Sequence, residues 1–412
     1  MSDRCYTEAM KTVAETQAEL LNVARPLTQT EALPLEQCLG RVLAEDVRSP
    51  IPVPGYDNSA MDGYAVRAAD LKADIETELP ISQRIPAGSV GAELAPGSCA
   101  RIFTGAPIPK GADAVVMQED VTANENTARF SGQPPTGDNI RPAGNDINQG
   151  DTVLTPGVKL EPQHLGLLAS LGLAEISVFR RLRVGVFFTG DELVKPGQPL
   201  SLDGQIYNSN VYTLQGLLEN FGCQVENLGI VRDDFEATRH ALKHAAEGND
   251  LIMTSGGVSV GEEDHVRAAV ESLGRIDLWR IAVRPGKPFA FGGVGDAIFM
   301  GLPGNPVSVF ATFMVLARPY ILRMQGRTDV LPGPLPVEAG FAWPKARIRR
   351  EFSRARLRPN ASGVMVAELH PRQSSEVLSS VVWCDGLVEI PEGAIVKPGE
   401  LVNFYPLSDL LR

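Results

Sequence analysis

The sequence predicts a multidomain protein that combines a doubly wound α/β domain with β domains. Two observations indicate this class. From residue 181 onward, short apolar runs alternate with polar loops and helical segments, a rhythm typical of a parallel sheet covered by helices. Between 49 and 150, and again beyond 330, short strand-like runs are separated by turns rich in proline and glycine, which is typical of small β domains.

Length and composition narrow the class of protein. A chain of 412 residues exceeds one ordinary core, because a domain holds roughly 100–200 residues. With 43% hydrophobic and 21% charged residues, and no run near the roughly 20 apolar residues that span a bilayer, we expect a soluble protein. The N-terminus has no apolar signal-peptide segment, so we expect a cytoplasmic location.

Charge and cysteine usage exclude further classes. The net charge of −12 opposes nonspecific binding to nucleic acid or to an anionic membrane, because the long-range field repels both. An anionic small substrate would need a local basic pocket. The cysteines are odd in number, scattered and without a CxxC pair, which favours reduced thiols over disulfides or structural zinc. They are Cys5, Cys38, Cys99, Cys223 and Cys384.

The N-terminal half is predicted to pass from helix into β structure. Apolar residues recur at helical spacing between 7 and 24, and Pro26 ends this helix. A short helix and a proline-rich extended segment then lead into the β region of 49–150, which contains the runs CARIFTG and ADAVVMQED. An apolar helix at 165–173 leads out of it.

The α/β region is predicted to contain four strands, each of which ends in small or oxygen-bearing residues before a helix. Because the carboxyl ends of parallel strands meet at one edge of a sheet, the loops that follow them should gather there. Beyond residue 330 the alternation of apolar and polar residues predicts a compact β-barrel or sandwich. The four strands are expected at 182–188, 225–231, 250–254 and 297–301.

Three acidic residues, Glu192, Asp233 and Asp264, follow three of these strands. Their oxygens are hard ligands of the kind that suits Mg²⁺, which keeps several waters and binds substrate phosphates. Each of them taken alone is equally well explained by its place near a helix N-terminus, where acids are common. As a set at successive strand ends they favour a metal-phosphate site.

A glycine-rich loop, Ser255, Gly256 and Gly257 in the run SGGVSVG, follows the predicted strand at 250–254. Glycines let main-chain N–H groups approach a ligand, and consecutive amides form a concavity that binds anions. Such a loop is a weak signal alone, but a helix predicted from about 264 to 273 gives it the right context. It is not a P-loop, because no GK[ST] follows.

A basic run contains Arg280, Arg284 and Lys287, the last after a Pro-Gly turn. Three cations that point alike would hold a phosphate or a tetrahedral oxyanion. The alternative is an exposed edge strand whose charges discourage aggregation. The rigid Pro-Gly-Lys-Pro turn favours binding.

Other candidate residues are explained without chemistry. A plain turn accounts for NSAMDGYA and for RIFTGAP. Asn208 and its neighbours are expected to cap a helix that runs to about residue 218, with no catalytic role. His240 and His244 have zinc-binding spacing but no HExxH glutamate between them, so an exposed helix face is expected. No catalytic histidine constellation is present, which argues against Ser-His hydrolase chemistry.

Seven motifs in order then carry a resemblance to a known family: NSAMDGYA, RIFTGAPIPKGADAVVMQE, RPAGNDINQGD, FFTGDELVKPGQ, TSGGVSVGEEDHV, RPGKPFAFG and GLPGNPVS. The chain resembles the MoeA family of molybdopterin molybdenumtransferases, which is related to the C-terminal domain of gephyrin. The likeness covers nearly all 412 residues. It implies a homodimer of four-part subunits, with a helical linker region at 1–48 and 151–180, an inserted β domain at 49–150, a molybdopterin-binding α/β domain at 181–328 and a C-terminal β-barrel at 329–412.

The resemblance also implies an activity. Enzymes of this family take adenylylated molybdopterin and molybdate, insert the metal into the dithiolene, and release AMP in a step that needs Mg²⁺. This reaction requires acidic ligands, a loop that cradles phosphate and a cationic pocket for an oxyanion, all of which the residues above suggest independently.

Residue roles follow from the matching motifs. The family places acidic active-site residues at Glu192, Asp233 and Asp264. Its cleft lies between subunits, so Asp62 would act across the dimer. The resemblance implies further roles in the β domain for Thr104 and Asp146, and contacts to molybdate from Arg284, Lys287, Ser308, Arg354 and Ser375. Some relatives carry lysine where this chain has Arg280 and Arg284; arginine keeps the charge and binds oxyanions in a bidentate manner.

Two alternatives stay open from the sequence. A molybdopterin adenylyltransferase would share the α/β domain and the SGG loop, but it would lack the β insertion and the barrel. A gephyrin-like scaffold would keep the fold for protein binding, although Glu192, Asp233, Asp264 and Lys287 argue against loss of catalysis. We also expect contacts with an adenylyltransferase and with a downstream molybdoenzyme or chaperone.

Overall fold

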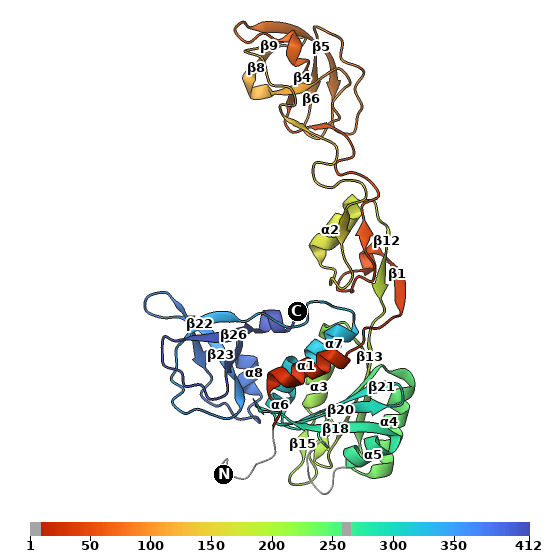
Figure 1. The fold of residues 1–412 in the computed structure, drawn as a ribbon, viewed down its shortest axis with the longest axis vertical. Coiled ribbons are helices and arrows are strands. Elements are labelled where there is room, and N and C mark those ends of the chain that lie inside the picture. The colour runs from red at the N-terminus through yellow and green to blue at the C-terminus, as the bar shows by residue number, and fades with distance from the viewer. Residues whose placement is uncertain (1–9, 258–264) are drawn as a thin grey trace.

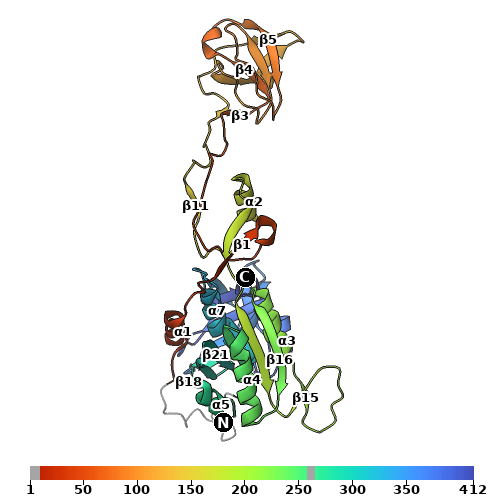
Figure 2. The same ribbon diagram turned by 90° about the vertical axis from the view of Figure 1, so that its right-hand side faces the viewer.

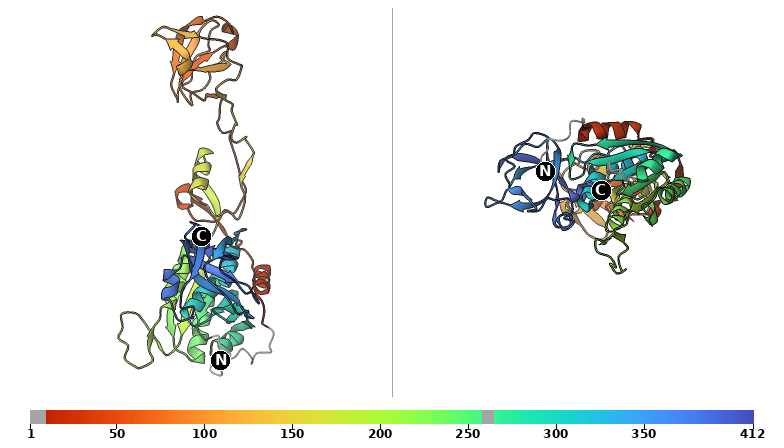
Figure 3. Two further views of the ribbon diagram at one scale, coloured as in Figure 1. Left: turned by 90° about the vertical axis from the view of Figure 1, so that its left-hand side faces the viewer. Right: turned by 90° about the horizontal axis from the view of Figure 1, so that it is seen from below.

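The computed structural model describes residues 10–257 and 265–412. The molecule is long, with a small β domain at one end and the α/β domain and barrel at the other (Figure 1). A slender linker region lies between them (Figure 2). Viewed along the long axis, the barrel and the α/β domain lie side by side (Figure 3).

The first helix, α1 (Val13–Val23), begins later than the sequence pattern predicted. The main chain of Lys11 pairs with Arg280 and Ala282, and Thr12 forms a capping box with Glu15, so the helix cannot extend back through these residues. Its buried side chains, including Val13 and Leu20, belong to the core of the α/β domain.

The linker region joins two distant parts of the chain. Strand β1 (Thr30–Pro34) pairs with β12 (Glu175–Phe179), and β2 (Val47–Arg48) pairs with β11 (Thr152–Leu154). The short helix is a 3₁₀ turn, Leu35–Gln37, and α2 (Pro162–Ser170) starts three residues before the predicted position because Pro162 suits the first helical turn. A separate apolar cluster fills this region; its members include Cys38, Leu43, Ile147, Leu160, Leu168 and Val178.

The inserted β domain holds a six-stranded sheet in the order β7-β4-β6-β5-β9-β8. The runs CARIFTG and ADAVVMQED form strands as predicted, β6 and β7. The strands are β4 (Gly63–Val66), β5 (Thr77–Ile85), β6 (Cys99–Ile102), β7 (Ala114–Met117), β8 (Val121–Ala123) and β9 (Thr127–Phe130), and β3 (Asn58–Ser59) pairs with β10 (Ile140–Arg141) below them.

The α/β domain is built on a six-stranded sheet in the order β16-β13-β17-β21-β20-β18. The four predicted strands are confirmed and are mutually parallel. Two antiparallel strands that the sequence pattern did not reveal extend the sheet. The strands are β13 (Arg183–Thr189), β16 (Gln224–Val231), β17 (Leu251–Ser255), β18 (Gly274–Arg280), β20 (Pro288–Val294) and β21 (Ala297–Leu302).

Helices cover both faces of this sheet, which confirms the doubly wound class. On one face α4 (Phe235–Gly248) and α5 (His265–Leu273) pack on Phe187 and Ile252. The other face is covered by α1, by α3 (Asn210–Asn220), and by α6 (Pro306–Thr312), which continues through a π turn into α7 (Arg318–Met324). Among the described residues one helix, Pro306–Met324, is long and apolar enough to cross a membrane, but 94% of its apolar window is buried inside the protein.

The C-terminal domain is a closed barrel, as predicted. Its five strands run in the order β23-β24-β22-β26-β25, and β25 pairs with β23 to close the ring. A short strand from the α/β domain, β19 (Val283–Arg284), pairs in parallel with the first two residues of β23. The barrel strands are β22 (Leu335–Ala339), β23 (Arg350–Pro359), β24 (Met365–Leu369), β25 (Gly386–Ile390) and β26 (Leu401–Pro406), with helices α8 (Ser379–Trp383) and α9 (Leu407–Leu410).

The cysteines of the described residues are free thiols, in agreement with the sequence pattern. Burial raises the pKa of Cys99 and of Cys223 to about 12, and that of Cys384 to about 11. Thiols of this kind stay protonated and unreactive at neutral pH.

Candidate functional site

The parallel strands end side by side at one edge of the α/β sheet. Thr189 at the end of β13 pairs with Val231 at the end of β16, and Ser255 at the end of β17 pairs with Leu302 at the end of β21. The loops that follow therefore start from the same level, at the edge where ligands bind in open α/β sheets. The predicted gathering of these loops is confirmed.

The glycine-rich loop is held tightly to this edge. Gly256 N–H donates to the carbonyl oxygen of Leu302 (3.1 Å), and the Ser255 hydroxyl lies 3.1 Å from the carbonyl oxygen of Pro303. Gly257 has φ +63°, and a Cβ there would lie 2.4 Å from Val266 Cγ2. Only glycine fits at this position, because both the backbone conformation and the neighbouring side chain exclude a larger residue.

Glu192 and Asp233 follow the adjacent strands β13 and β16. A Cβ built at Gly190 would lie 2.6 Å from Glu192 Oε2, so this carboxylate folds back over the end of β13. The cap of α4 is the next acid, Asp234, whose Oδ1 accepts from Ala237 N–H at 2.8 Å. Helix capping therefore does not account for Asp233.

The third predicted acid, Asp264, lies outside the described residues, as do Glu262 and Glu263. Within 10–257 and 265–412, no group of three or more histidine, cysteine, aspartate or glutamate side chains is close enough to hold a metal ion.

The basic run connects the sheet to the barrel and is not one extended strand. Arg280 ends β18, whereas Arg284 lies in β19 against the barrel. Arg284 Nη1 lies 3.3 Å from Glu351 Oε1, which also accepts from Arg347 (2.7 Å). Glu351 is 4% exposed, and this burial raises its pKa, with Arg347 acting in the opposite direction.

The turn after Arg284 packs along α6, against Ser308 near its start and Thr312 at its end. Gly286 has φ +98°, and a Cβ there would lie 2.5 Å from Thr312 Oγ1 and 3.8 Å from Ser308 Cβ. Ser308 is 3% exposed and follows Pro306 in the first turn of α6. The turn that carries Lys287 and the helix that carries Ser308 are therefore in direct contact.

A short segment of the barrel domain around Ser375 also contacts the start of α6. The carbonyl oxygen of Ser375 accepts from Val307 N–H at 3.0 Å. Arg354, which is 1% exposed, lies 3.0 Å from the Ser380 hydroxyl and 3.2 Å from the carbonyl oxygen of Ser374. Burial lowers the pKa of Arg354. The structure thus joins Arg284, Ser308, Arg354 and Ser375 at the junction of barrel and α/β domain.

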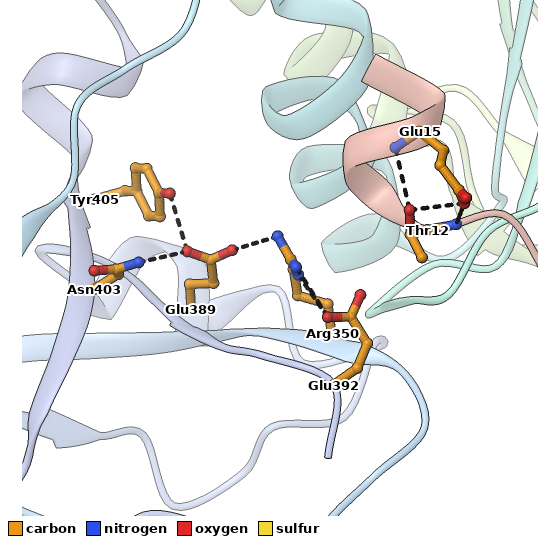
Figure 4. A network of polar contacts seen from close by, with 7 residues as sticks. All are labelled: Thr12, Glu15, Arg350, Glu389, Glu392, Asn403 and Tyr405. Carbon is orange, nitrogen blue, oxygen red and sulfur yellow. Dashed lines mark hydrogen bonds and ion pairs between the residues drawn. The ribbon is translucent and has the colours of Figure 1, made fainter. Parts of the chain in front are cut away.

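A second network stiffens the barrel wall beside this junction (Figure 4). Arg350 Nη1 and Nη2 lie 2.9 Å from Glu389 and 2.9 Å from Glu392. The second oxygen of Glu389 accepts from Asn403 (2.9 Å) and from Tyr405 (3.1 Å). Because Arg350 N–H also bonds to the carbonyl oxygen of Ala282, the network fixes β23 against the basic run.

Asp62 and Thr104 form a pair of their own in the β domain. Asp62 Oδ1 accepts from the N–H (2.8 Å) and from the hydroxyl (2.9 Å) of Thr104. These two hydrogen bonds lower the pKa of Asp62. Asp146 is exposed, and its N–H bonds to the carbonyl oxygen of Val53. The β domain lies at the opposite end of the molecule from the sheet edge, so one copy of the chain does not bring these residues to Glu192 (Figure 1).

Sequence reasoning missed Asn210. Asn208 makes the capping contact with Val211 N–H (3.3 Å), whereas Asn210 Nδ2 reaches the Ser255 hydroxyl (2.9 Å) and the carbonyl oxygen of Gly304 (2.7 Å). Nothing in the sequence distinguishes the two asparagines, since either could cap the helix. His244 on α4 is exposed and lies 3.6 Å from Glu226, as expected for a solvated helix face.

Comparison with known proteins agrees with this geometry. Residues 11–172 match the MoeA N-terminal region (domains I and II), 185–323 match a probable molybdopterin binding domain, and 336–407 match the MoeA C-terminal region (domain IV). A molybdopterin molybdenumtransferase of Haemophilus influenzae is 43% identical over 98% of this chain and 100% of its own length. The chain belongs to the molybdopterin molybdenumtransferase family.

Other members of the molybdopterin molybdenumtransferase family show the same full-length likeness. Molybdopterin molybdenumtransferase 2 of Mycobacterium tuberculosis is 37% identical over 97% of this chain and 100% of its own length. The crystal structure of a molybdopterin biosynthesis MoeA protein from Pyrococcus horikoshii has a TM-score of 0.83 at 29% identity, with 96% of this chain and 100% of that chain covered. The family and the multidomain fold are therefore both established.

Proposed function

We propose that this enzyme inserts molybdate into adenylylated molybdopterin and releases AMP, forming molybdenum cofactor in the cytoplasm. The observation that carries this proposal is the contact between the carboxyl edge of the α/β sheet and the cationic junction with the barrel, made by Val307 and Ser375. The first supplies amides and carboxylates for a phosphate, and the second supplies cations for a tetrahedral oxoanion.

The roles divide along this contact. The loop of Ser255, Gly256 and Gly257 lies against the phosphate of the pterin nucleotide, with the N–H of Gly257 as the proposed donor, since the N–H of Gly256 is bonded to Leu302. Arg280 lies at the entrance to the basic run. The molybdate is held by Arg284, Lys287, Ser308, Arg354 and Ser375.

Mg²⁺ fits the acidic edge. Glu192 and Asp233 offer hard oxygen ligands at adjacent strand ends, and Mg²⁺ in proteins is commonly held by one or two carboxylates together with substrate phosphates. Asp264 is a third proposed ligand on sequence grounds. When bound, the ion would supply positive charge against the phosphate oxygens.

The cations then orient the oxoanion for reaction. Held by Arg284 and Lys287, a molybdate oxygen attacks the phosphorus of the adenylyl group and displaces the pterin phosphate as the phosphoanhydride bond breaks. The Mo–O bond to that oxygen then breaks as the two dithiolene sulfurs bind molybdenum, so AMP leaves with the oxygen, and the two thiol protons leave with a second molybdate oxygen as water. Positioning of this kind is the main contribution that a protein makes to phosphoryl chemistry.

The remaining site residues point to a homodimer. Asp62, Thr104 and Asp146 lie in or beside the β domain, remote from the sheet edge of their own chain. We infer that a second copy brings its β domain over the cleft, so that Asp62 and Thr104 act across the dimer. An adenylyltransferase that supplies the pterin nucleotide and a molybdoenzyme or chaperone that takes the product are the expected protein partners.

The two alternatives are not favoured. A molybdopterin adenylyltransferase would need neither the inserted β domain nor the barrel, and the relatives that match nearly the whole chain are named molybdenumtransferases. The same full-length likeness to proteins named molybdenumtransferases counts against a scaffold without activity.

A direct assay tests the proposal. Purified protein is incubated with adenylylated molybdopterin, molybdate and Mg²⁺, and both AMP release and reconstitution of a cofactor-free molybdoenzyme are measured. We expect both to depend on molybdate and to stop when Mg²⁺ is chelated. AMP release that is indifferent to molybdate would reject the function.

A further inference from the structure

Three segments meet around one side chain at the carboxyl edge of the sheet. Asn210 is the first residue of α3, Ser255 ends β17, and Gly304 belongs to the loop after β21. Asn210 Nδ2 lies 2.9 Å from Ser255 Oγ and 2.7 Å from the carbonyl oxygen of Gly304. The amide therefore ties together two loops that lie far apart in the sequence.

The direction of these hydrogen bonds is determined by their chemistry. A carbonyl oxygen can only accept, so the NH₂ group of Asn210 must face Gly304. With the other N–H it donates to the Ser255 hydroxyl, and that hydroxyl gives its own proton to the carbonyl oxygen of Pro303, 3.1 Å away. The result is a directed chain from Asn210 through Ser255 to Pro303.

The two tied loops are the walls of the proposed phosphate cradle. Gly256 N–H is already bonded to the carbonyl oxygen of Leu302, and the Cα of Gly256 lies 3.8 Å from the position of a Cβ on Gly304. The loops are thus in contact, and the amide of Asn210 fixes their spacing. Groups that bind a ligand must be held within a fraction of an ångström of the productive geometry.

We propose that Asn210 is a positioning residue: by donating both N–H groups of its amide it holds the Ser255–Gly257 loop against the loop of Pro303 and Gly304 in the conformation that binds the pterin nucleotide. This inference rests on the proposed function for its substrate. The bonds that it invokes are independent of that substrate.

The first test measures the loop itself. Hydrogen exchange is compared between the wild-type protein, Asn210→Ala and the isosteric Asn210→Asp. In both variants the Gly256 amide should exchange about tenfold faster than in the wild type, because the loop opens more readily. The Asp variant fills the same space but opposes Gly304 with an acceptor, so unchanged exchange in N210D would overturn the proposal.

The second test measures turnover. Asn210→Ala should raise the KM for adenylylated molybdopterin about tenfold and change kcat by less than about threefold, because the loop conformation affects binding of substrate and transition state alike. Combined with Ser255→Ala its effect should be less than additive, since both substitutions remove the bond between Asn210 and Ser255, whereas only N210A removes the bond to Gly304.

A matched control lies on the same helix. Asn220, at the other end of α3, donates its Nδ2 to the main-chain oxygen of Leu411 (2.5 Å), and Asn220→Ala should leave the KM unchanged. Equal KM values for N210A and the wild type, or equal KM increases in N210A and N220A, would overturn the positioning role. A wild-type protein without molybdate-dependent AMP release would overturn the proposed function, whatever the exchange data show.

Discussion

At the scale of the single residue, the glycines of the phosphate loop are the positions where the backbone and its neighbours leave least freedom. Gly256 has φ +96° and Gly257 φ +63°, a region that side chains rarely adopt. At Gly257 the space is also filled, by Val266 and Thr189. The SGG motif is therefore required by the fold of the loop as well as by any ligand.

Gly257→Ala should lower the free energy of unfolding by about 2–4 kcal/mol, because strain in the left-handed region adds to a clash with Val266. Urea unfolding measures this change. The matched control is Gly295→Ala, at φ +57° with nothing within 4 Å of the new Cβ, which should cost only about 1 kcal/mol. Equal losses in the two variants would show that the clash with Val266 is absent.

The Asp62 and Thr104 pair makes a prediction about pH. Hydrogen bonds from Thr104 lower the pKa of Asp62, so the stability that they contribute is present above the ordinary carboxyl pKa and is lost as the pH falls through the lowered value. Thr104→Ala keeps the main-chain bond and removes the hydroxyl bond, so the pKa of Asp62 should rise part of the way toward its usual range.

An NMR titration of the Asp62 carboxyl measures this shift. The control is Thr127→Ala, which removes a similar hydroxyl bond to Glu78 and should move the pKa of Glu78 while leaving that of Asp62 unchanged. No rise at Asp62 in T104A would show that the main-chain N–H alone sets the shift.

Residue roles could be anticipated from the sequence only where the pattern was unambiguous. Three acids at strand ends suggested one site, and the family motif selected Asp233; the structure adds that its neighbour Asp234 is the residue that caps α4. Asn210, by contrast, was assigned to capping. A short polar side chain before a helix can cap it or reach across a loop, and only the tertiary structure decides between the two.

At the scale of secondary structure elements, long apolar runs were the reliable signal. Three of the four parallel strands, β13, β17 and β21, were predicted because buried strands are continuous apolar runs that end in small residues, whereas β16 is a half-exposed edge strand with a mixed sequence. The antiparallel strands β18 and β20 were not predicted. Arg275, Asp277 and Arg280 break the apolar pattern of β18, and glycines interrupt that of β20. An edge strand that is half exposed carries just such residues.

The adjacent residues Asp233 and Asp234, just before α4, are expected to differ in their roles. Asp234→Ala removes the N-cap and should lower the free energy of unfolding by about 1 kcal/mol while AMP release stays near wild type. Asp233→Ala should reduce turnover at least about a hundredfold, because it removes a proposed Mg²⁺ ligand.

Thermal unfolding and the AMP-release assay, run on both variants, measure the two effects side by side. The pair is its own control, since the residues are neighbours with the same chemistry. A large loss of turnover in D234A with normal turnover in D233A would reverse the assignment of cap and ligand.

At the scale of the whole molecule, the inserted β domain and the carboxyl edge of the α/β sheet lie at opposite ends. Sequence analysis could anticipate the domains and, through family resemblance, a dimer. It could not show how far the β domain lies from the sheet edge, because domain separation depends on the linker strands and their pairing.

Mixing two inactive variants tests the cross-subunit site. If Asp62 and Glu192 come from different copies, Asp62→Ala unfolded and refolded together with Glu192→Ala should recover about one quarter of wild-type activity, since half of the dimers are mixed and each carries one intact site. Steady-state AMP release measures the recovery.

The control pair is Glu192→Ala with Asp233→Ala. Both residues follow neighbouring strands of one sheet, so every site in the mixed dimer keeps a defect and no activity should return. Recovery in the control pair, or none in the test pair, would contradict a site shared in this way.

The strand β19 has a consequence for how such proteins can change over evolution. Strand β19 belongs to the α/β domain but pairs with β23 of the barrel. A barrel domain that was lost or exchanged without β19 would therefore leave this part of β23 unpaired. The inserted β domain, tethered only by two chain crossings, carries no such restriction. Related proteins should therefore vary most in the inserted β domain and keep the α/β domain and the barrel together.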